Sequence, residues 1–318
     1  LVKCSYPRVS ECFNAFIKLE NLQPSGSFKD RGISCMINSI LKTDKIKKLV
    51  SSSGGNAGHA VATAGRTLGI PVDVFVPITT KPMMIAKLKR KGANVFVHGA
   101  NWNEADKMAR EEVAKDDHSY YIPPYDDPRI WEGHSTIIDE IASSGIVPDK
   151  IIVSVGGGGL LCGIQRGILR HGWQDRTKVV AVETEGAASF AASSTAGKLV
   201  SLTGITSIAS SLGALSVTSA CLDSGVSTIS LVVPDKAAVT ACRRFADEFN
   251  MLVEPACGAA LSYLYCPQSE RVESVDVNED ENKNKEKAKE TVVVIACGGS
   301  VVNIELLAKW CADFNVES

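Results

Sequence analysis

Short apolar runs alternate with amphipathic stretches along most of the chain. The apolar runs are rich in β-branched residues and predict strands at 47–52, 72–77, 94–99, 150–155, 178–183, 228–233 and 291–297. Helical patterns separate them, for example KPMMIAKLKRKGA at 81–93. Apolar strands that alternate with helices are typical of parallel sheets covered by helices. The pattern therefore predicts an α/β protein.

The length of 318 residues exceeds one typical hydrophobic core, so we expect a large and a small domain. Residues 40–131 carry three of the predicted strands and are expected to form the small domain. Residues 1–39 and 132–318 are expected to form the large domain. Within it, residues 269–290 are almost entirely charged or polar, which predicts a disordered insertion ahead of the last strand.

Composition argues for a small-molecule partner. A formal net charge of −2 gives no general attraction to nucleic acid or to an acidic membrane surface. The ten cysteines are scattered without a CxxC pair, which favours a reduced chain over disulfides or zinc. The uncharged run 199–222 is rich in serine and threonine and is not a membrane helix. We expect a cytoplasmic protein, with the mitochondrion open because the sequence begins without methionine.

The clearest chemical signal is a glycine-rich turn, VSVGGGGLLCG at 153–163, between a predicted strand and a predicted helix. Glycines let several backbone N–H groups point at one anion at a helix N-terminus. The GK[ST] sequence of a Walker loop is missing. A Rossmann turn stays a weaker alternative, because Leu161 or Cys162 takes its third small position. Tight helix–sheet packing without a ligand is the other alternative. The turn predicts a phosphate cradle.

A second glycine-rich turn, SSSGGNAGHA at 51–60, also comes after a predicted strand and opens a helix. Its polar groups suit a carboxylate: the hydroxyls of Ser52 and Ser53, the N–H groups of Gly54 and Gly55, and the Asn56 amide. The alternative is a serine cluster that caps the helix. Two further turns, EPACGAAL at 254–261 and ACGGS at 296–300, are also expected at helix starts.

Lys29 lies in PSGSFKDRG at 24–32, a run of small residues before a helical pattern. Taken alone, such a lysine is most often a surface charge. A bound phosphate, a bound carboxylate and a nearby lysine together indicate something else. Pyridoxal phosphate carries a phosphate group and condenses with a lysine amine as a Schiff base. The residues therefore predict a pyridoxal phosphate site with Lys29 as its nucleophile.

Motifs in a fixed order along nearly the whole chain resemble the fold-type II pyridoxal phosphate enzymes: LQPSGSFKDRG, SSGGNAG, IWEGH, SVGGGGLLCG, ITSIASSLG, VEPACGAAL and VIACGGS. Within that family they are most similar to the eukaryotic catabolic L-serine/L-threonine dehydratases. The resemblance implies a tryptophan synthase β-like fold with two open, mostly parallel sheet lobes, one large and one small. The stretch before Lys29 lacks the family's Thr-Pro-Leu, so we expect an altered or incomplete first strand.

The resemblance also implies a role for each site residue. Lys29 would carry the Schiff base, Phe28 would pack on the ring, Asn56 would bind the ring hydroxyl and Cys297 would face the pyridine nitrogen. The phosphate would be held by Gly156, Gly157, Gly158, Gly159 and Leu160. The substrate carboxylate would be received by Ser53, Gly54 and Asn56. A monovalent cation, expected to be K⁺, would be held by Glu183 and by backbone oxygens around Ala187, Leu212 and Ala214.

The implied reaction is an α,β-elimination. Lys29 would take the Cα proton of serine and the cofactor phosphate would protonate the leaving hydroxyl, giving pyruvate and ammonia, or 2-oxobutanoate from threonine. A β-replacement enzyme or serine racemase of the same fold is one alternative, and a weakly active or non-catalytic pyridoxal phosphate-binding protein is another. We expect a homodimer. The five histidines are interpreted as structural or solvated, with His134 at the lobe boundary.

Overall fold

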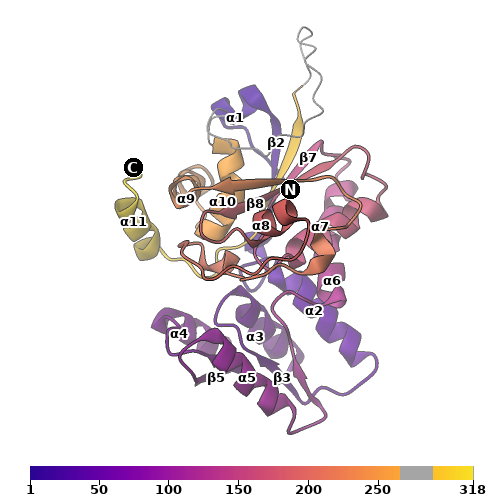
Figure 1. Cartoon of the computed structure of the whole chain (residues 1–318), viewed down its shortest axis with the longest axis vertical. Helices are drawn as coiled ribbons and strands as arrows, with labels where there is room; N and C mark the ends of the chain where they lie inside the picture. Colours follow the sequence, from indigo (N-terminus) through magenta and orange to yellow (C-terminus); the bar gives the residue numbers. More distant parts are fainter. Residues whose placement is uncertain (266–288, 318) are drawn as a thin grey trace.

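The computed structural model describes residues 1–265 and 289–317. These residues form a six-stranded mixed sheet and a four-stranded parallel sheet, each flanked by helices. Figure 1 shows the larger sheet and its helices above the smaller ones, with α2 (Lys29–Leu41) running between them. The prediction of an α/β protein with two mostly parallel sheets of unequal size is confirmed.

The larger sheet joins strands from both ends of the chain. Its spatial order is β1 (Val2–Lys3), β2 (Asn14–Leu19), β10 (Thr291–Ala296), β7 (Lys150–Ser154), β8 (Lys178–Thr184) and β9 (Thr228–Val233). Only β1 runs antiparallel to its neighbour. The strands β7, β8 and β10 match the predicted runs, because they are buried almost throughout and therefore apolar almost throughout.

The smaller sheet has the order β5 (Asn94–Val97), β4 (Val72–Val76), β3 (Lys48–Ser51) and β6 (Ser119–Tyr121), all parallel. Three strands were predicted in this region, and the structure has four. Strand β6 is only three residues long and has no apolar run to mark it. The domain boundaries at residues 39/40 and 131/132 stay a prediction.

Helices come after most strands, as the alternating pattern predicted. The described helices are α1 (Pro7–Cys12), α2, α3 (Asn56–Leu68), α4 (Pro82–Arg90), α5 (Trp102–Val113), α6 (Pro128–Ser143), α7 (Gly159–Arg170), α8 (Ser189–Ala196), α9 (Asp235–Phe249), α10 (Pro255–Tyr265) and α11 (Ile304–Asp313). Helix α10 is buried along its whole length and packs against β7, β8 and β10. Helix α6 packs against both α2 and α7.

The two glycine-rich turns near the C-terminal end of the chain lead into different structures. EPACGAAL at 254–261 does open a helix, α10, as predicted. ACGGS at 296–300 does not, because the backbone continues as an irregular turn and α11 begins only at Ile304. There Asn303 caps the helix by accepting from the Leu306 N–H at 2.9 Å. The expectation of a helix start at 296–300 is therefore wrong.

The first long strand, β2, contains a buried lysine. Lys18 pairs with Glu20 at 2.8 Å and with Glu140 at 2.7 Å. These ion pairs make burial of the ammonium tolerable, since a buried charge needs partners. The strand pairs in parallel with β10. The sequence pattern missed it because a lysine interrupts the apolar run.

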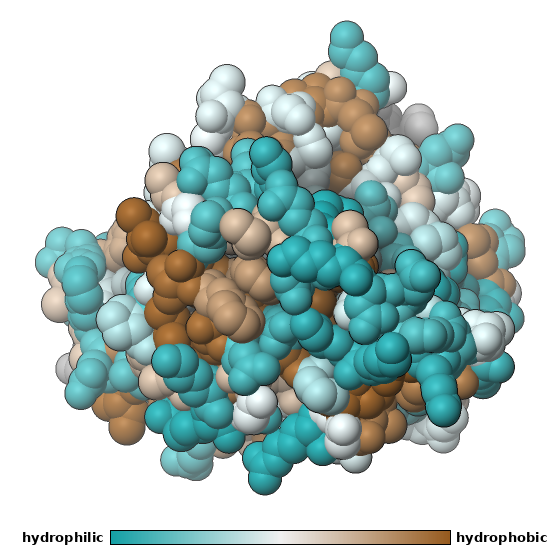
Figure 2. All heavy atoms as spheres, turned by 90° about the horizontal axis from the view of Figure 1, so that it is seen from below, coloured by the Kyte–Doolittle hydropathy of each residue, from teal (hydrophilic) through white to brown (hydrophobic). Residues whose placement is uncertain are grey.

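Other expectations concern the surface and the cysteines. No helix among residues 1–265 and 289–317 is both long and apolar enough to span a membrane. The nine cysteines in this part of the chain are free, in agreement with a reduced chain. Seen from the small-lobe end, the surface is largely hydrophilic with separate hydrophobic patches (Figure 2). Of the predicted insertion at 269–290, only residues 289 and 290 are described; the rest lies outside the described residues.

Candidate active site

The predicted motifs meet at the carboxyl ends of the strands. The Phe28 N–H donates to the Cys297 carbonyl at 3.0 Å, which joins the lysine turn to the end of β10. The Asn56 side chain donates to Glu254 Oε1 at 2.5 Å, which joins the start of α3 to the start of α10. Ligands collect at this edge of open α/β sheets. The structure thus gathers segments that lie far apart in the sequence.

Lys29 is the first residue of α2 and its amine is held inside the protein. Its Nζ donates to the Pro124 carbonyl at 2.5 Å and lies 5.0 Å from the centre of the Phe28 ring. Burial lowers the pKa of Lys29 to about 8, against the fields of Cys297 and Glu254, which raise it. A sizeable fraction of neutral amine is therefore present near neutral pH, as a nucleophile or base requires.

The ring of Phe28 packs edge-on against His134, with 4.8 Å between ring centres. His134 is fully buried, and burial lowers its pKa well below the usual value, with the Lys29 charge acting in the same direction. A neutral, buried ring beside Phe28 agrees with the structural role predicted for this histidine. The packing fixes Phe28 next to the lysine amine.

The glycine loop at 156–159 forms a cradle without side chains at the start of α7. Gly158 has a φ of +86°, which favours glycine, and it precedes the helix as its N-cap. A Cβ on Gly157 would lie 2.4 Å from the Tyr125 ring, and one on Gly159 would lie 2.6 Å from the Tyr125 carbonyl. Within the described part of the chain, the N–H groups of Gly156 to Leu160 donate to no protein acceptor. Such free amides at a helix start suit an anion.

The residues of the loop at 51–56, predicted to bind the substrate carboxylate, have different surroundings. Ser53 and Gly54 lie in the turn before α3, whose N-cap Gly55 has no side-chain capping bond. The Ser53 hydroxyl accepts from the Gly55 N–H at 3.3 Å, so a serine does contact the backbone at the start of this helix. The Ser52 hydroxyl instead donates to Asp106 at 2.7 Å and contacts the Tyr121 hydroxyl at 2.9 Å. The expectation that Ser52 faces a carboxylate is wrong; Ser53, Gly54 and Asn56 stay as predicted carboxylate ligands.

Asn56 belongs to a network that the sequence did not reveal. Its Nδ2 donates to Glu254, and its Oδ1 accepts from the Ser300 hydroxyl. Glu254 is almost completely buried, and this burial raises its pKa to about 7, while the Asn56 bond opposes the shift. The network fixes the orientation of the Asn56 amide. Its only sequence signal was that Glu254 and Ser300 stand in glycine-rich motifs.

Cys297, directly after β10, is a buried thiol. The neighbouring Cys257 thiol and burial together raise the pKa of Cys297 well above its usual value. The side chain therefore stays a neutral thiol.

The residues predicted to hold a cation lie at the end of β8 and in the segment before β9. Glu183 is fully buried, and both of its oxygens accept from the backbone of α8, from Phe190 at 2.8 Å and Ala191 at 2.7 Å. Burial raises its pKa to about 7, which these two bonds oppose. Ala187 lies just after β8, and Leu212 with Ala214 lies in the segment that flanks Gly156. Glu183 thus caps a helix in this structure, and the cation site stays a prediction.

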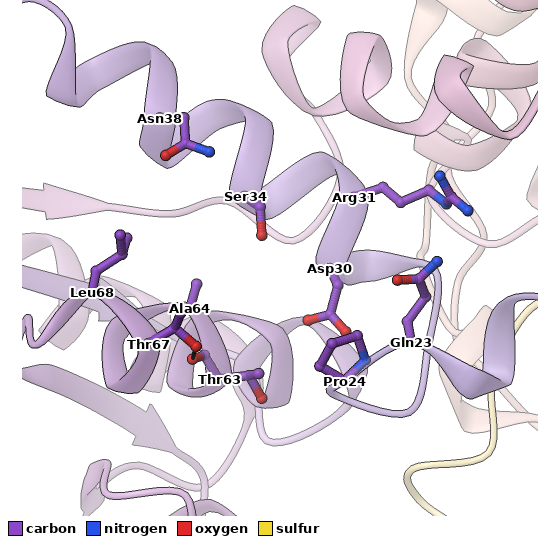
Figure 3. A pocket seen from close by; sticks show the side chains of 10 residues that line it. All are labelled: Gln23, Pro24, Asp30, Arg31, Ser34, Asn38, Thr63, Ala64, Thr67 and Leu68. Carbon is purple, nitrogen blue, oxygen red and sulfur yellow. Dashed lines mark hydrogen bonds between the residues drawn. The ribbon is translucent and has the colours of Figure 1, made fainter. Parts of the chain in front are cut away.

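A separate cavity of about 380 Å³ begins one residue after Lys29. Figure 3 shows its side chains, which come from the turn at 23–24, from α2 and from α3. Arg31 is committed to Glu20 and Glu140, and Asp30 accepts from the Ser25 N–H at 2.5 Å. None of the predicted site residues lines this cavity. It is therefore distinct from the lysine and glycine-loop site.

The residues present fit pyridoxal phosphate. The loop at 156–160 offers unpaired amides and a side-chain-free cradle to an anionic group. The Lys29 amine has a pKa near 8 and stands beside the Phe28 ring, and the Cys297 thiol is neutral. Phe28, Lys29, Asn56, the glycine loop and Cys297 would together hold the group. These individual roles stay predictions.

Comparison with known proteins gives one consistent answer. The family model described as "Pyridoxal-phosphate dependent enzyme" matches residues 3–298. A human protein named "Serine dehydratase-like" is 43% identical over 91% of this chain and 85% of its own length. A bovine protein named "L-serine dehydratase/L-threonine deaminase" is 42% identical over 92% of this chain and 88% of its own length.

The solved structures agree with the sequence comparison. The crystal structure of a fungal L-serine ammonia-lyase from Rhizomucor miehei superposes with a TM-score of 0.86 at 33% identity, over 97% of this chain and 96% of that one. The resemblance drawn from the motifs is confirmed. The chain belongs to the family of pyridoxal-phosphate dependent enzymes.

Proposed function

We propose that this chain is a pyridoxal phosphate-dependent L-serine and L-threonine dehydratase. The observation that carries the proposal is the Lys29 amine, enclosed under the Pro124 carbonyl and with its pKa lowered to about 8, at the same strand edge as the glycine cradle. The names of the human and bovine relatives and of the fungal structure support the same reaction. The products are pyruvate and ammonia from serine, and 2-oxobutanoate and ammonia from threonine.

When bound, pyridoxal phosphate supplies an electron sink that makes the Cα–H bond of an amino acid acidic. The chain supplies the groups that position it. The amides of Gly156 to Leu160 would bind its phosphate, Phe28 would pack against its ring and Asn56 would bind the ring hydroxyl. Glu254 and Ser300 act as positioning residues, because they fix the Asn56 amide through two hydrogen bonds.

Substrate binding falls to the turn before α3. The N–H groups at this helix start bind the carboxylate together with the Ser53 hydroxyl, which in this structure accepts from the Gly55 N–H at 3.3 Å. This contact orients the amino acid so that its Cα–H points toward Lys29. The segment of Pro124 and Tyr125 contacts both the lysine amine and the glycine loop.

Lys29 carries the proton transfer. Its Nζ, largely desolvated, is neutral in part of the population near neutral pH and takes the Cα proton. The neutral Cys297 thiol is a weak donor, so it would leave a facing ring nitrogen largely unprotonated. The β-hydroxyl would leave as water after it takes up a proton, for which the resemblance implies the cofactor phosphate as donor.

Three finer points rest on the resemblance alone. We propose K⁺ at Glu183 with the backbone oxygens of Ala187, Leu212 and Ala214, a homodimer, and the cytoplasm or mitochondrion as compartment. The cation would compete with the two backbone bonds that Glu183 now accepts. Activity measured in K⁺ against a large organic cation, and the mass of the particle in solution, test the first two points.

A single comparison tests the reaction. Purified protein is titrated with L-serine while the cofactor absorbance and pyruvate are recorded, for the wild type, Lys29→Ala and Lys42→Ala. We expect pyruvate from the wild type and from Lys42→Ala, whose lysine lies at the other end of α2, and none from Lys29→Ala. A cofactor band that shifts with serine without pyruvate would identify a non-catalytic binder. Formation of D-serine would identify a racemase.

Preference between the two substrates depends on one methyl group. Such a group changes selectivity by about 1–3 kcal/mol, that is about 5- to 150-fold in kcat/KM. The same assay run with L-threonine, in which 2-oxobutanoate is measured, determines the ratio.

A further inference from the structure

A second pocket, of about 280 Å³, lies where the small lobe meets two turns of the large lobe. Helices α3 and α4, together with Lys91 just after α4, form one wall, and the turns around Ser25 and Ser300 form the other. Its lining residues are Ser25, His59, Lys87, Arg90, Lys91 and Ser300. None of the residues assigned to the cofactor or the substrate is among them. The pocket therefore needs its own explanation.

Its charge is strongly positive. Lys87, Arg90 and Lys91 all line it, and no acidic side chain of residues 1–265 or 289–317 forms an ion pair with any of the three. Lys87 donates to the carbonyls of Ser300 at 2.6 Å and Val302 at 3.2 Å. Lys91 donates to the Thr63 hydroxyl at 2.9 Å and contacts the Pro24 carbonyl at 3.5 Å. Neutral acceptors thus hold two of the cations, and neither forms an ion pair with a described acidic side chain.

The nearest acids are committed elsewhere. Asp30, whose field reaches Lys91, accepts from the Ser25 N–H at 2.5 Å. Glu254, whose field reaches Lys87, accepts from Asn56 at 2.5 Å. Burial lowers the pKa of both Lys87 and Lys91, and at Lys87 the repulsion from Arg90 and Lys91 acts in the same direction. An anion in the pocket would relieve this repulsion.

One buried side chain of the pocket has no partner. His59 is fully buried, and neither of its ring nitrogens has a hydrogen-bond partner among the described residues. The Ser25 hydroxyl, also buried, lies beside the Asp30 carboxylate and opposes the rise in its pKa that burial causes. Buried polar groups are almost always paired in folded proteins, because an unpaired group loses its hydration without compensation. The His59 ring therefore points to a ligand.

The state of His59 restricts the ligand further. Burial and the three cations lower the pKa of His59 to about 4, so its ring is neutral at neutral pH. A neutral imidazole has one donor and one acceptor nitrogen. A ligand that bonds both ring nitrogens must accept a hydrogen bond from the N–H and donate one to the other nitrogen. Hydrogen phosphate does so, since it carries both charged oxygens and a P–OH group, whereas sulfate only accepts.

We propose that this pocket binds inorganic phosphate, held by Lys87, Arg90 and Lys91 as cations and by His59 as a hydrogen-bonding partner. The bound ion would link α3 and α4 to the turns at Ser25 and Ser300. Because Ser300 also donates to Asn56, the ion would stabilise the turn that orients this residue. The proposal does not depend on the reaction, since none of these four ligands belongs to the catalytic site.

The test is a calorimetric titration of the cofactor-loaded protein with inorganic phosphate in phosphate-free buffer. Loading the cofactor first fills the glycine loop, so that a second phosphate site is counted separately. We expect one ion bound per chain. Arg90→Ala should weaken binding about tenfold or more, because it removes a charge-assisted contact. Arg90 is exposed and lies at the end of α4, so the fold should tolerate the change.

The matched control is Lys89→Ala, which removes the same charge from the neighbouring position, outside the pocket lining. Its phosphate affinity should equal that of the wild type. Equal weakening in both variants, or no binding of phosphate to the wild type at millimolar concentration, would overturn the proposal. The former result would mean that only the general charge of α4 attracts the ion.

Two further titrations identify the occupant. Sulfate should bind more weakly than phosphate in the wild type, and His59→Phe, which removes both ring nitrogens but keeps a ring, should reduce that difference. Sulfate that binds as tightly as phosphate would overturn the role of His59. Glycerol 3-phosphate carries a phosphate that is mostly a dianion without a P–OH at neutral pH, and it should also bind more weakly. A tighter ester would overturn the free ion as occupant.

Discussion

The glycine cradle gives the sharpest prediction, for the substitution Gly157→Ala. The added methyl would lie 2.4 Å from Cγ of Tyr125 and 2.5 Å from both of its Cδ atoms. Carbon atoms in contact normally stand about 3.5–4.0 Å apart, so the ring or the loop must move by roughly 1 Å. Overpacking of this kind costs about 1–3 kcal/mol. If that cost falls on the conformation that binds phosphate, cofactor affinity drops by about 5- to 150-fold.

The assay is a titration of apoenzyme with pyridoxal phosphate, monitored by absorbance, with thermal unfolding as a check of the fold. Gly204→Ala is the matched control, since a Cβ there meets no atom within 4 Å and no positive φ forbids it. We expect a weakened Kd for Gly157→Ala and an unchanged Kd for Gly204→Ala. A Gly157→Ala protein that binds the cofactor as tightly as the wild type would refute the cradle.

Three other predictions concern individual side chains of the site. Ser53→Ala should raise the KM for serine about 3- to 10-fold, the usual worth of one hydrogen bond, whereas Ser52→Ala should leave it nearly unchanged because that hydroxyl bonds Asp106; equal effects in kinetic assays would contradict this division. The pKa of Glu254 is about 7 in the folded state, above the usual value of 4.5. Between pH 4.5 and 7 the folded state therefore binds more protons than the unfolded state, so the free energy of unfolding falls as the pH rises through this range. Glu254→Gln should flatten this fall in urea titrations at several pH values, and an unchanged slope would argue against it. Glu183→Ala should lower the free energy of unfolding by about 1–3 kcal/mol, because the Phe190 and Ala191 amides lose their acceptor, and should remove any activation by K⁺. Denaturant titration and activity in K⁺ check this, and unchanged stability would contradict the capping role.

Much of the site was predictable because its parts are local. The glycine-rich turns at 51–60 and 153–163 follow apolar strands, and their glycines indicate a tight backbone turn without any knowledge of distant residues. Lys29 stands in a motif that resembles a known family. The chemistry of each turn could be inferred from backbone amides at a helix start. The sequence did not show which residue of a turn contacts which group. Ser52 and Ser53 are adjacent and identical, and only their neighbours in space distinguish them.

The sequence alone determined the fold class, the positions of most strands and the two glycine-rich turns predicted to bind anions, since periodicity and glycine placement act over a few residues. The tertiary structure determined which distant residues contact one another. Asn56 meets Glu254 and Ser300 across 198 and 244 positions, and Lys29 meets Pro124 across 95. The pocket of cations around His59 likewise exists only where α4 meets two distant turns. Such contacts depend on how the two sheets and their helices pack together, and packing of distant segments leaves no periodic trace in the order of residues.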